Sequence, residues 1–432
     1  MKLQTLWVAV AAALTLPTAS AGSLQEIYQQ ALQSDPQLKI ARANYLAGAE
    51  IAQQSRAALL PSVSLDASLG RTDSSPELPL DGSASRIGVS LSQPVFRAQN
   101  WYNYQVGQLQ SERAGIEFSR AEQALIRRTV DAYLNVLQTQ TSHSTALAEE
   151  AAVKRRLEQV KAQFEVGLIA ITDVEEAQAA FDTAQVNRII AEGELDNSFE
   201  AIDRLVGGSW RKLEQLGKPF PVVALTPTEF QPWVDKALQG NIGLQLASYD
   251  VKVADTGRES AKAGHYPTVD LVASYTLDDG NISTEQVDRS FIGLNLKLPL
   301  YLGGSTRSSE RQSYQRWDAA LQQREDVQRA VVQDTRSLFR NLRTDVQTVA
   351  ARKQSIVSSQ TALDATEAGY SVGTRNIVDV LQAERALYAA ERDYETARYN
   401  YVRNLFRFKE TLGTLNPDDL VELDRWLVAS DS

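Results

Sequence analysis

The chain has 432 residues, a formal net charge of −10, no cysteine and only two histidines, His143 and His265. An acidic chain is a poor match for nucleic acid, a chain without cysteine has no disulfide or thiolate site, and two distant histidines supply little for a metal or acid–base centre. Because GxSxG, HExxH and GxxxxGK[ST] motifs are also missing, we expect no enzyme activity, no cofactor and no metal site.

The first 21 residues have the pattern of an export signal. Lys2 provides a basic start, and residues 6–16 form an apolar stretch too short to span a bilayer as a helix. Ala19-Ser20-Ala21 is a small-residue cleavage site, so the mature chain is predicted to begin at Gly22. Loss of Lys2 leaves 43 basic and 54 acidic residues.

An internal duplication organises the rest of the chain. VGLIAITDV at residues 166–174 returns as VGTRNIVDV at 372–380, and Pro61-Ser62-Val63 returns as Pro267-Thr268-Val269, at the same offset of 206 residues. A linker rich in glycine and proline separates the two copies. The predicted division is a signal peptide at 1–21, a first repeat at 22–206, a linker at 207–229, a second repeat at 230–413 and a tail at 414–432.

Each repeat contains one predicted β-hairpin, at residues 61–95 and 267–299. Apolar and polar residues alternate over about nine to ten positions per strand, which is typical of a membrane strand with an apolar outer face and a polar lumen. A half-buried strand of a soluble sandwich has the same alternation, so the pattern leaves both readings open. The connections at 71–85 and 278–289 are polar and predicted to be loops.

Aromatic residues gather where the strands meet the predicted helices, as an interfacial belt requires, although scattered core aromatics are an alternative. They are Phe96, Trp101, Tyr102, Tyr104, Tyr266 and Tyr301. Natural barrels have about eight strands or more. Four spanning strands therefore predict a barrel that is shared between chains.

Long helices are predicted around the hairpins, in pairs joined by a glycine turn. The first repeat has a helix at 97–166 and a return helix at 172–206, and the second repeat has helices at 304–372 and 376–413. The first of these spans ~105 Å at ~1.5 Å per residue. Apolar residues seven apart predict side-by-side packing as coiled coils. These residues are Leu342, Val349, Ile356, Leu363 and Tyr370, followed by Val380, Leu387, Tyr394 and Tyr401.

Four segments resemble the TolC family of outer-membrane channel-tunnels: residues 59–62, 163–174, 367–381 and 397–415. The resemblance implies a mixed α and β membrane protein with four transmembrane strands per chain and long coiled-coil helices in two tandem repeats. Three chains would then form a 12-stranded β-barrel and a 12-helix α-barrel tunnel, with the linker and tail in an equatorial belt. The implied location is the outer membrane of a Gram-negative bacterium, with a long periplasmic extension.

The two glycine turns would form the periplasmic tips of this tunnel. Glycine permits a tight reversal whatever else the turn does, and the resemblance implies that the tips also receive a periplasmic adaptor. The residues expected to take part in docking are Val166, Gly167, Leu168, Val372, Gly373 and Thr374.

Polar residues beside the tips are similar to those that hold family members closed. Those expected to link the coiled coils or neighbouring chains are Tyr370, Arg375, Thr172 and Asp173, while Asp379 would form an acidic ring at the constriction. There are two departures from the family pattern. Gln382 replaces a second aspartate, which leaves three carboxylates in a trimer, and Arg156 faces Glu367 where relatives carry glutamine.

A local alternative applies to some of these polar residues. Thr172 with Glu175, and Asn376 with Asp379, have the spacing of a helix N-cap followed by an acid in the first turn. A residue can both cap a helix and line a pore, so capping alone does not exclude the gate.

The implied function is a passive exit duct for multidrug efflux or type I protein secretion. It would be opened at its periplasmic end by docking with an adaptor (membrane fusion) protein and an inner-membrane transporter of the ABC, RND or MFS type. The expected partners are therefore two further copies of the chain, this adaptor and transporter, and outer-membrane lipid. A soluble, exported coiled-coil scaffold is the alternative, and the sequence does not name the cargo.

Overall fold

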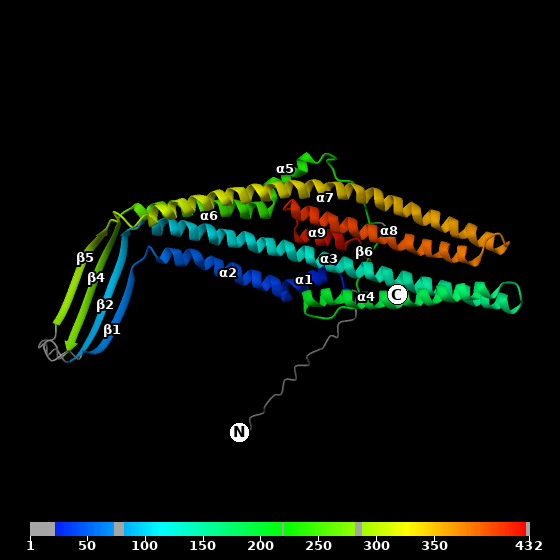
Figure 1. Ribbon diagram of the computed structural model, residues 1–432, viewed down its shortest axis with the longest axis horizontal. Coiled ribbons are helices and arrows are strands. Elements are labelled where there is room, and N and C mark those ends of the chain that lie inside the picture. Colours follow the sequence, from blue (N-terminus) through cyan, green and yellow to red (C-terminus); the bar gives the residue numbers. More distant parts are fainter. Residues whose placement is uncertain (1–21, 73–81, 218–219, 281–286, 429–432) are drawn as a thin grey trace, which may run out of the picture.

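The structure is a computed structural model that describes residues 22–72, 82–217, 220–280 and 287–428. The predicted signal peptide lies outside the described residues, as do the central parts of the two predicted strand loops and the last residues of the tail. Figure 1 shows an elongated molecule with a small sheet at one end, long helices running away from it, and two helical turns at the opposite end.

The four long strands form one antiparallel sheet in the order β1-β2-β4-β5, so β1 and β5 are its open edges. The strands are β1 (Ser62–Thr72), β2 (Gly82–Phe96), β4 (Thr268–Gly280) and β5 (Val287–Lys297). They have 11, 15, 13 and 11 residues, more than the nine to ten predicted. The loop predictions for residues 71–85 and 278–289 were both wrong at their ends, because Arg71 pairs with Ser83 and Asp278 pairs with Val287. Backbone pairing continues there through polar residues, since a ladder needs no apolar alternation.

One face of this sheet is apolar across the strands. Leu65 lies opposite Val89, which lies opposite Tyr275, and these side chains are 69%, 44% and 46% exposed. On the other face Ser64 lies opposite Ser90, with 2.7 Å between their hydroxyl oxygens. The alternation predicted from the sequence therefore gives a sheet with one exposed apolar face and one largely polar face.

Next to the sheet, four helices lie side by side in the same order as the strands: α2 packs on α3, α3 on α6, and α6 on α7. They are α2 (Pro36–Ala57), α3 (Ala98–Glu165), α6 (Ile242–Lys262) and α7 (Ser305–Ser371). No helix in the described ranges has a stretch long and apolar enough to cross a membrane.

Farther from the sheet, the neighbours of the two long helices change. There α4 (Ile171–Val206) packs on α3, α8 (Ile377–Thr411) packs on α7, and α8 also contacts α3. The heptad residues are at these contacts, because Leu342 and Val349 of α7 are buried and so are Val380 and Leu387 of α8. Each long helix therefore forms a coiled coil with a different short helix in each half of the molecule.

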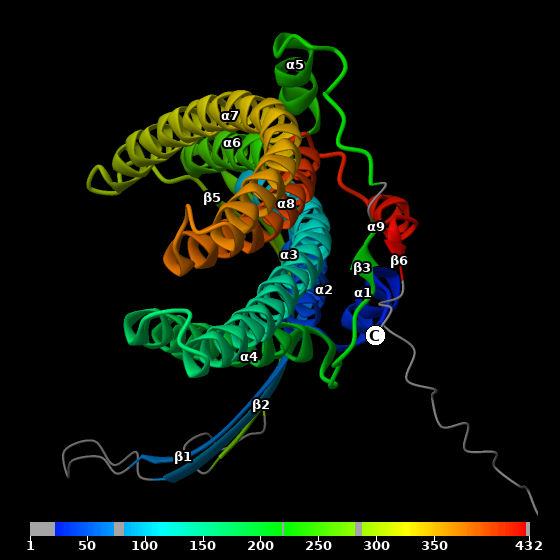
Figure 2. The ribbon, with the colours of Figure 1, turned by 90° about the vertical axis from the view of Figure 1, so that its right-hand side faces the viewer.

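A belt of short elements lies around the middle of the rod. It consists of α1 (Leu24–Ser34), β3 (Gln215–Leu216), α5 (Gln231–Gly240), α9 (Pro417–Asp424) and β6 (Leu427–Val428). β3 from the linker pairs with β6 from the tail, and Gly22 bridges Leu213. Figure 2 shows these elements on the convex side of the curved helical wall, with α5 beside α7.

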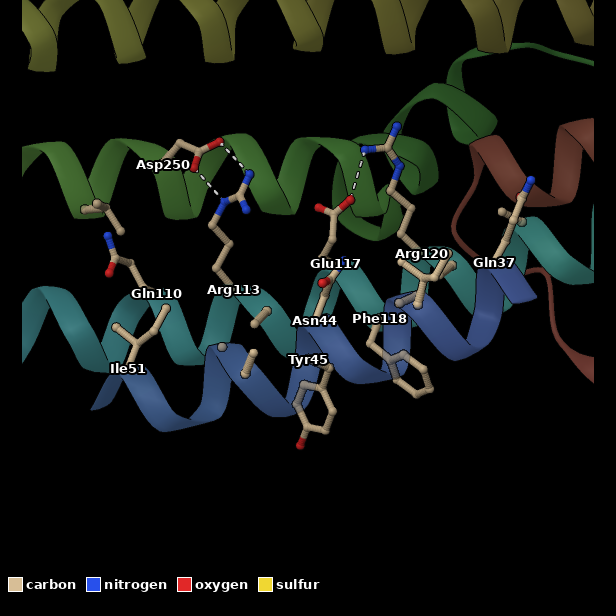
Figure 3. Close-up of a pocket in the computed structure, with 18 residues that line it drawn as sticks. Gln37, Asn44, Tyr45, Ile51, Gln110, Arg113, Glu117, Phe118, Arg120 and Asp250 are labelled. Atoms are coloured by element: carbon tan, nitrogen blue, oxygen red, sulfur yellow. Dashed lines mark hydrogen bonds and ion pairs between the residues drawn. The ribbon is translucent and has the colours of Figure 1, made fainter. Parts of the chain in front are cut away.

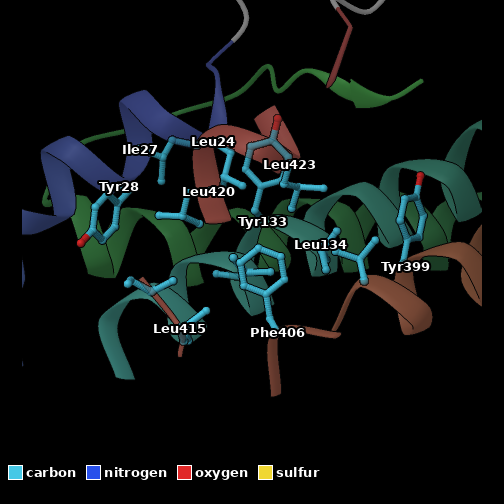
Figure 4. Packing of buried hydrophobic residues seen from close by; sticks show 14 of the residues in the cluster. Leu24, Ile27, Tyr28, Tyr133, Leu134, Tyr399, Phe406, Leu415, Leu420 and Leu423 are labelled. Carbon is cyan, nitrogen blue, oxygen red and sulfur yellow. The ribbon is translucent and has the colours of Figure 1, made fainter. Parts of the chain in front are cut away.

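The main apolar core lies between this belt and the long helices. Leu24 and Ile27 of α1 meet Tyr133 of α3, Phe406 of α8 and Leu420 of α9 in one buried cluster (Figure 4). The phenol of Tyr133 also donates to the backbone oxygen of Glu214 at 2.8 Å, which ties the linker to α3. Because this cluster draws on both ends of the chain and on its centre, the belt and the helices fold as one body.

Candidate functional site at the helical tips

Both helical turns have the same backbone geometry. Gly167 and Gly373 have φ of 75° and 74°, in the left-handed region that favours glycine. Two backbone hydrogen bonds close each turn: Gly167 N–H donates to Phe164 and Leu168 N–H to Gln163, both at 2.9 Å, with equivalent bonds at the second tip. Nothing lies within 4 Å of the place that a Cβ would take at either glycine, so glycine serves the backbone conformation and not close packing.

The tips carry exposed apolar side chains. Val166 is 70% exposed, and Leu168 and Val372 are each 73% exposed. Gly167, Gly373 and Thr374 complete the two turns, so the residues predicted for docking form two neighbouring tip surfaces of similar chemistry. Grouped apolar residues on such a surface are typical of a contact site for another protein.

The start of α8 confirms the predicted cap. Asp379 N–H donates to Asn376 Oδ1 at 2.9 Å, and Asn376 N–H points back to Asp379 Oδ2 at 3.5 Å, which is a capping box. Arg375 Nη1 lies 3.7 Å from the same carboxylate, so within one chain Arg375 contacts its own turn. Gln382 lies three residues farther along α8 and is exposed.

The predicted cap of the other return helix was wrong. α4 begins at Ile171 with Ala170 as its N-cap, and no side chain caps it. Thr172 is therefore already inside the helix and exposed, because the helix starts two residues earlier than a cap at Thr172 requires. Asp173 follows in the first turn, where its negative charge favours the positive end of the helix dipole.

Tyr370 joins the two coiled coils near the tips. Its phenol donates to Gln163 Oε1 at 2.9 Å, which connects α7 to α3. Burial raises the pKa of Tyr370, and the nearby negative charge of Asp173 raises it further, while Arg156 acts in the opposite direction. The phenol therefore stays protonated and able to donate over the physiological pH range.

Arg156 lies at the centre of a second link, on α3. Its Nη2 is 2.9 Å from Glu384 Oε1 of α8 and also pairs with Glu367 of α7, as predicted for this residue pair. Burial alone would lower the pKa of Arg156, but the two carboxylates more than offset it and the net shift is upward. The side chains of Arg156 and Glu384 are only 13% and 9% exposed, so one guanidinium ties three helices together in a largely buried place.

The sequence reasoning missed Gln163 and Glu384 as members of these links. Glu384 has a signal that could have revealed it, since it lies seven residues after the buried Ile377 and so occupies a core position of the heptad. A charge at a core position needs a partner. Glu384 Oε2 and Arg156 Nε remain buried without a hydrogen bond among the described residues.

A separate groove of about 840 Å³ lies between α2, α3 and α6 (Figure 3), the helices that adjoin the sheet in Figure 1. Arg113 Nε of α3 lies 2.6 Å from Asp250 Oδ1 of α6 along one side of it. Tyr45 and Phe118 stack with their ring centres 5.6 Å apart. Among the described residues, no group of three or more histidine, aspartate and glutamate side chains is placed to hold a metal ion.

An exposed apolar sheet face, continued by two tandem coiled-coil hairpins with matching tips, defines an outer-membrane channel-tunnel. Residues 27–208 and 233–414 each match the sequence profile of the outer membrane efflux protein family. The chain belongs to this family.

Curated relatives cover nearly the whole chain. It is 36% identical to the outer membrane protein TolC of Vibrio cholerae serotype O1, over 99% of this chain and 98% of that protein. It is also 36% identical to TolC of Escherichia coli K12, over 94% of this chain and 85% of that protein. The alkaline protease secretion protein AprF of Pseudomonas aeruginosa is 28% identical, over 91% and 85%.

Solved structures show the same fold at lower identity. The outer membrane protein VceC of Vibrio cholerae superposes with a TM-score of 0.78 at 17% identity, covering 90% of this chain and 96% of VceC. The CmeC outer membrane channel of Campylobacter jejuni gives 0.80 at 15% identity, covering 99% and 98%. The chain is thus an outer-membrane efflux or type I secretion duct of a Gram-negative bacterium and not an enzyme, and the soluble scaffold alternative is not supported.

Proposed function

We propose that three copies of this chain form a passive duct that is closed at its tips by polar links and opened when an adaptor docks there. The duct would work with a periplasmic adaptor (membrane fusion) protein and an inner-membrane transporter of the ABC, RND or MFS type. One relative is named for alkaline protease secretion and another for toluene efflux, so both protein export and small-molecule efflux are consistent with the duct.

The observation that carries this proposal is the pair of links behind the tips. Tyr370 with Gln163, and Arg156 with Glu367 and Glu384, fasten the second coiled coil to the first. To widen the tip end, α7 and α8 must move away from α3, and that movement breaks both links. The closed state is therefore held by a small number of polar contacts that docking energy can replace.

Further contacts are proposed at the edges that a single chain leaves open. Thr172 is exposed on α4, while Asp173 and Arg375 lie beside the turns. Neighbouring protomers in a trimer would bring such residues of one tip close to those of the next. Adaptor docking is proposed for the exposed tip surfaces formed by Val166, Leu168 and Val372, because a partner that covers them removes apolar surface from water.

Single-channel conductance in planar bilayers tests the closed state. The Tyr370→Phe and Arg375→Ser double variant should conduct several-fold more than the parent, because Phe cannot donate to Gln163 and Ser cannot reach a neighbouring carboxylate. Tyr314→Phe, at the other end of α7, is the matched control and should leave conductance unchanged. An unaltered conductance in the double variant would remove these residues from the gate.

A further inference from the structure

A groove of about 480 Å³ lies between the end of α6 and the start of α7, and we call it the basic groove. Four cationic residues line it, and only two carboxylates do. The cations are Arg258, Lys262, Arg307 and Arg311, and the carboxylates are Glu259 and Glu310. The groove therefore presents a surplus of positive charge in a protein that is acidic as a whole.

Part of this positive charge is unpaired. Arg258 pairs with Asp255 at 2.7 Å and with Glu259 at 3.3 Å, yet its Nε is buried without a hydrogen bond. Lys262 reaches Glu259 only at 4.0 Å. Within the described ranges no ion pair or hydrogen bond occupies Arg307 or Arg311, which are both exposed. The guanidinium of Arg258 also lies over the Trp317 ring, 5.0 Å from its centre, so the donors free to bind an anion with several oxygen atoms are those of Arg307 and Arg311.

The basic groove lies where the helices meet the sheet. α6 passes through the short 3-10 helix η1 (Ala263–His265) into β4, which begins at Thr268. On the other side β5 ends at Lys297, and α7 begins at Ser305. The connection between β5 and α7 carries Leu300 and Tyr301, which are 88% and 85% exposed. Basic residues thus adjoin apolar ones at the helix-proximal end of the apolar sheet face, the arrangement of a membrane–water interface.

The groove opens on the outer face of the helical wall. A second hollow farther along α6 and α7 is bordered by α5, and its residues are in heptad register with those of the basic groove. On α6, Lys252 of the second hollow lies seven residues before Glu259 of the basic groove. On α7, Gln328 of the second hollow lies fourteen residues after Tyr314 of the basic groove. Since α5 lies on the convex side of the wall in Figure 2, the basic groove opens on that side too. This side faces away from the lumen that a closed helical tunnel would enclose.

We propose that the basic groove binds the headgroup phosphate of an anionic phospholipid in the periplasmic leaflet of the outer membrane. Arg307 and Arg311 would contact the phosphate oxygens, for which the guanidinium fork is well matched. The acyl chains would lie along the exposed Leu300 and Tyr301 toward the apolar face of the sheet. The bound lipid would fix the height of the channel in the membrane.

Lipid binding to the purified channel in detergent tests the proposal, with phosphatidylglycerol and phosphatidylcholine titrated in parallel and bound lipid counted by native mass spectrometry. The parent chain should prefer phosphatidylglycerol. Arg307→Gln with Arg311→Gln should weaken binding of that lipid roughly 30-fold, since each of the two basic residues contributes about 1 kcal/mol at an anionic surface and about 1.4 kcal/mol is a factor of ten. Equal binding of the two lipids by the parent would overturn the proposal without any variant.

A charge-matched control separates a built site from general attraction. Arg316→Gln with Arg329→Gln removes the same charge from α7 outside the groove and should leave the affinity for phosphatidylglycerol unchanged. An equal loss in this control would show that only net charge matters. Inorganic phosphate supplies a second check, because displacement of the lipid by an equal concentration of phosphate would make the groove a soluble-anion site and overturn the lipid assignment.

Discussion

At the scale of single residues, Asp379 shows that a cap and a pore carboxylate are compatible. Its backbone N–H and its Oδ2 complete the capping box with Asn376, and Arg375 approaches the same oxygen. No hydrogen bond to Oδ1 is present among the described residues, so the carboxylate keeps an oxygen available to a cation. Gln382 lies one turn away, exposed and uncharged.

Multivalent cations should block the channel weakly from its tip side. In the proposed trimer, three Asp379 carboxylates would lie in a narrow constriction and attract cations, and Gln382 would add no charge to them. Gln382→Asp should tighten the block several-fold, and Asp379→Asn should abolish most of it. Single-channel current titrated with a trivalent cation measures both effects.

Asp318→Asn is the control for this titration, because it removes a carboxylate from the distant end of α7 and should leave the block unchanged. A block of Asp379→Asn equal to that of the parent would mean that Asp379 acts only as a helix cap.

At the scale of elements, the sequence predicts helices more sharply than strands. The helix predicted at 97–166 spans Ala98–Glu165, because apolar heptads and a glycine turn fix its length. β2 instead runs from Gly82 to Phe96, beyond its apolar alternation, since its ends are set by backbone pairing with residues of another segment. The link from Arg156 to Glu384 was not predicted, because it too depends on another segment of the chain. Heptads show which residues face inward but not which residues of two helices contact each other.

The Arg156–Glu384 pair should stabilise the packing of α8 on α3. Arg156→Leu leaves Glu384 largely buried without its cation, which should lower the free energy of unfolding by about 3–5 kcal/mol. The double variant Arg156→Leu with Glu384→Leu should lower the free energy of unfolding clearly less, because neither member of this pair is left as a buried charge. Hydrogen exchange of the α8 backbone around Glu384 measures the difference.

An exposed pair on the other long helix, α7, provides the comparison. Arg329 and Glu325 are 77% and 47% exposed, so Arg329→Leu should change exchange in α8 little. If Arg156→Leu behaves like Arg329→Leu, then water reaches the Arg156 site and the pair contributes no more than a surface contact.

At the scale of the whole molecule, the two open sheet edges require assembly. β1 and β5 leave backbone donors and acceptors unpaired, and a membrane interior offers no water to satisfy them. We expect the purified protein to be a trimer in detergent, with a mass three times that of the chain after subtraction of bound detergent. A monodisperse monomer that binds little detergent would contradict the shared sheet.

The belt at mid-length holds the long helices at one level, so the tip end can move relative to it. β3 pairs with β6 and Gly22 bridges Leu213, so both ends of the chain and its centre are fastened at one level, where Tyr133 of α3 is buried. From that level α3 continues unbroken to Glu165, a lever arm of ~48 Å at ~1.5 Å per residue. A bend of only ~5° in α3 at the belt moves the tip by ~4 Å, so the aperture can open while the sheet end stays still.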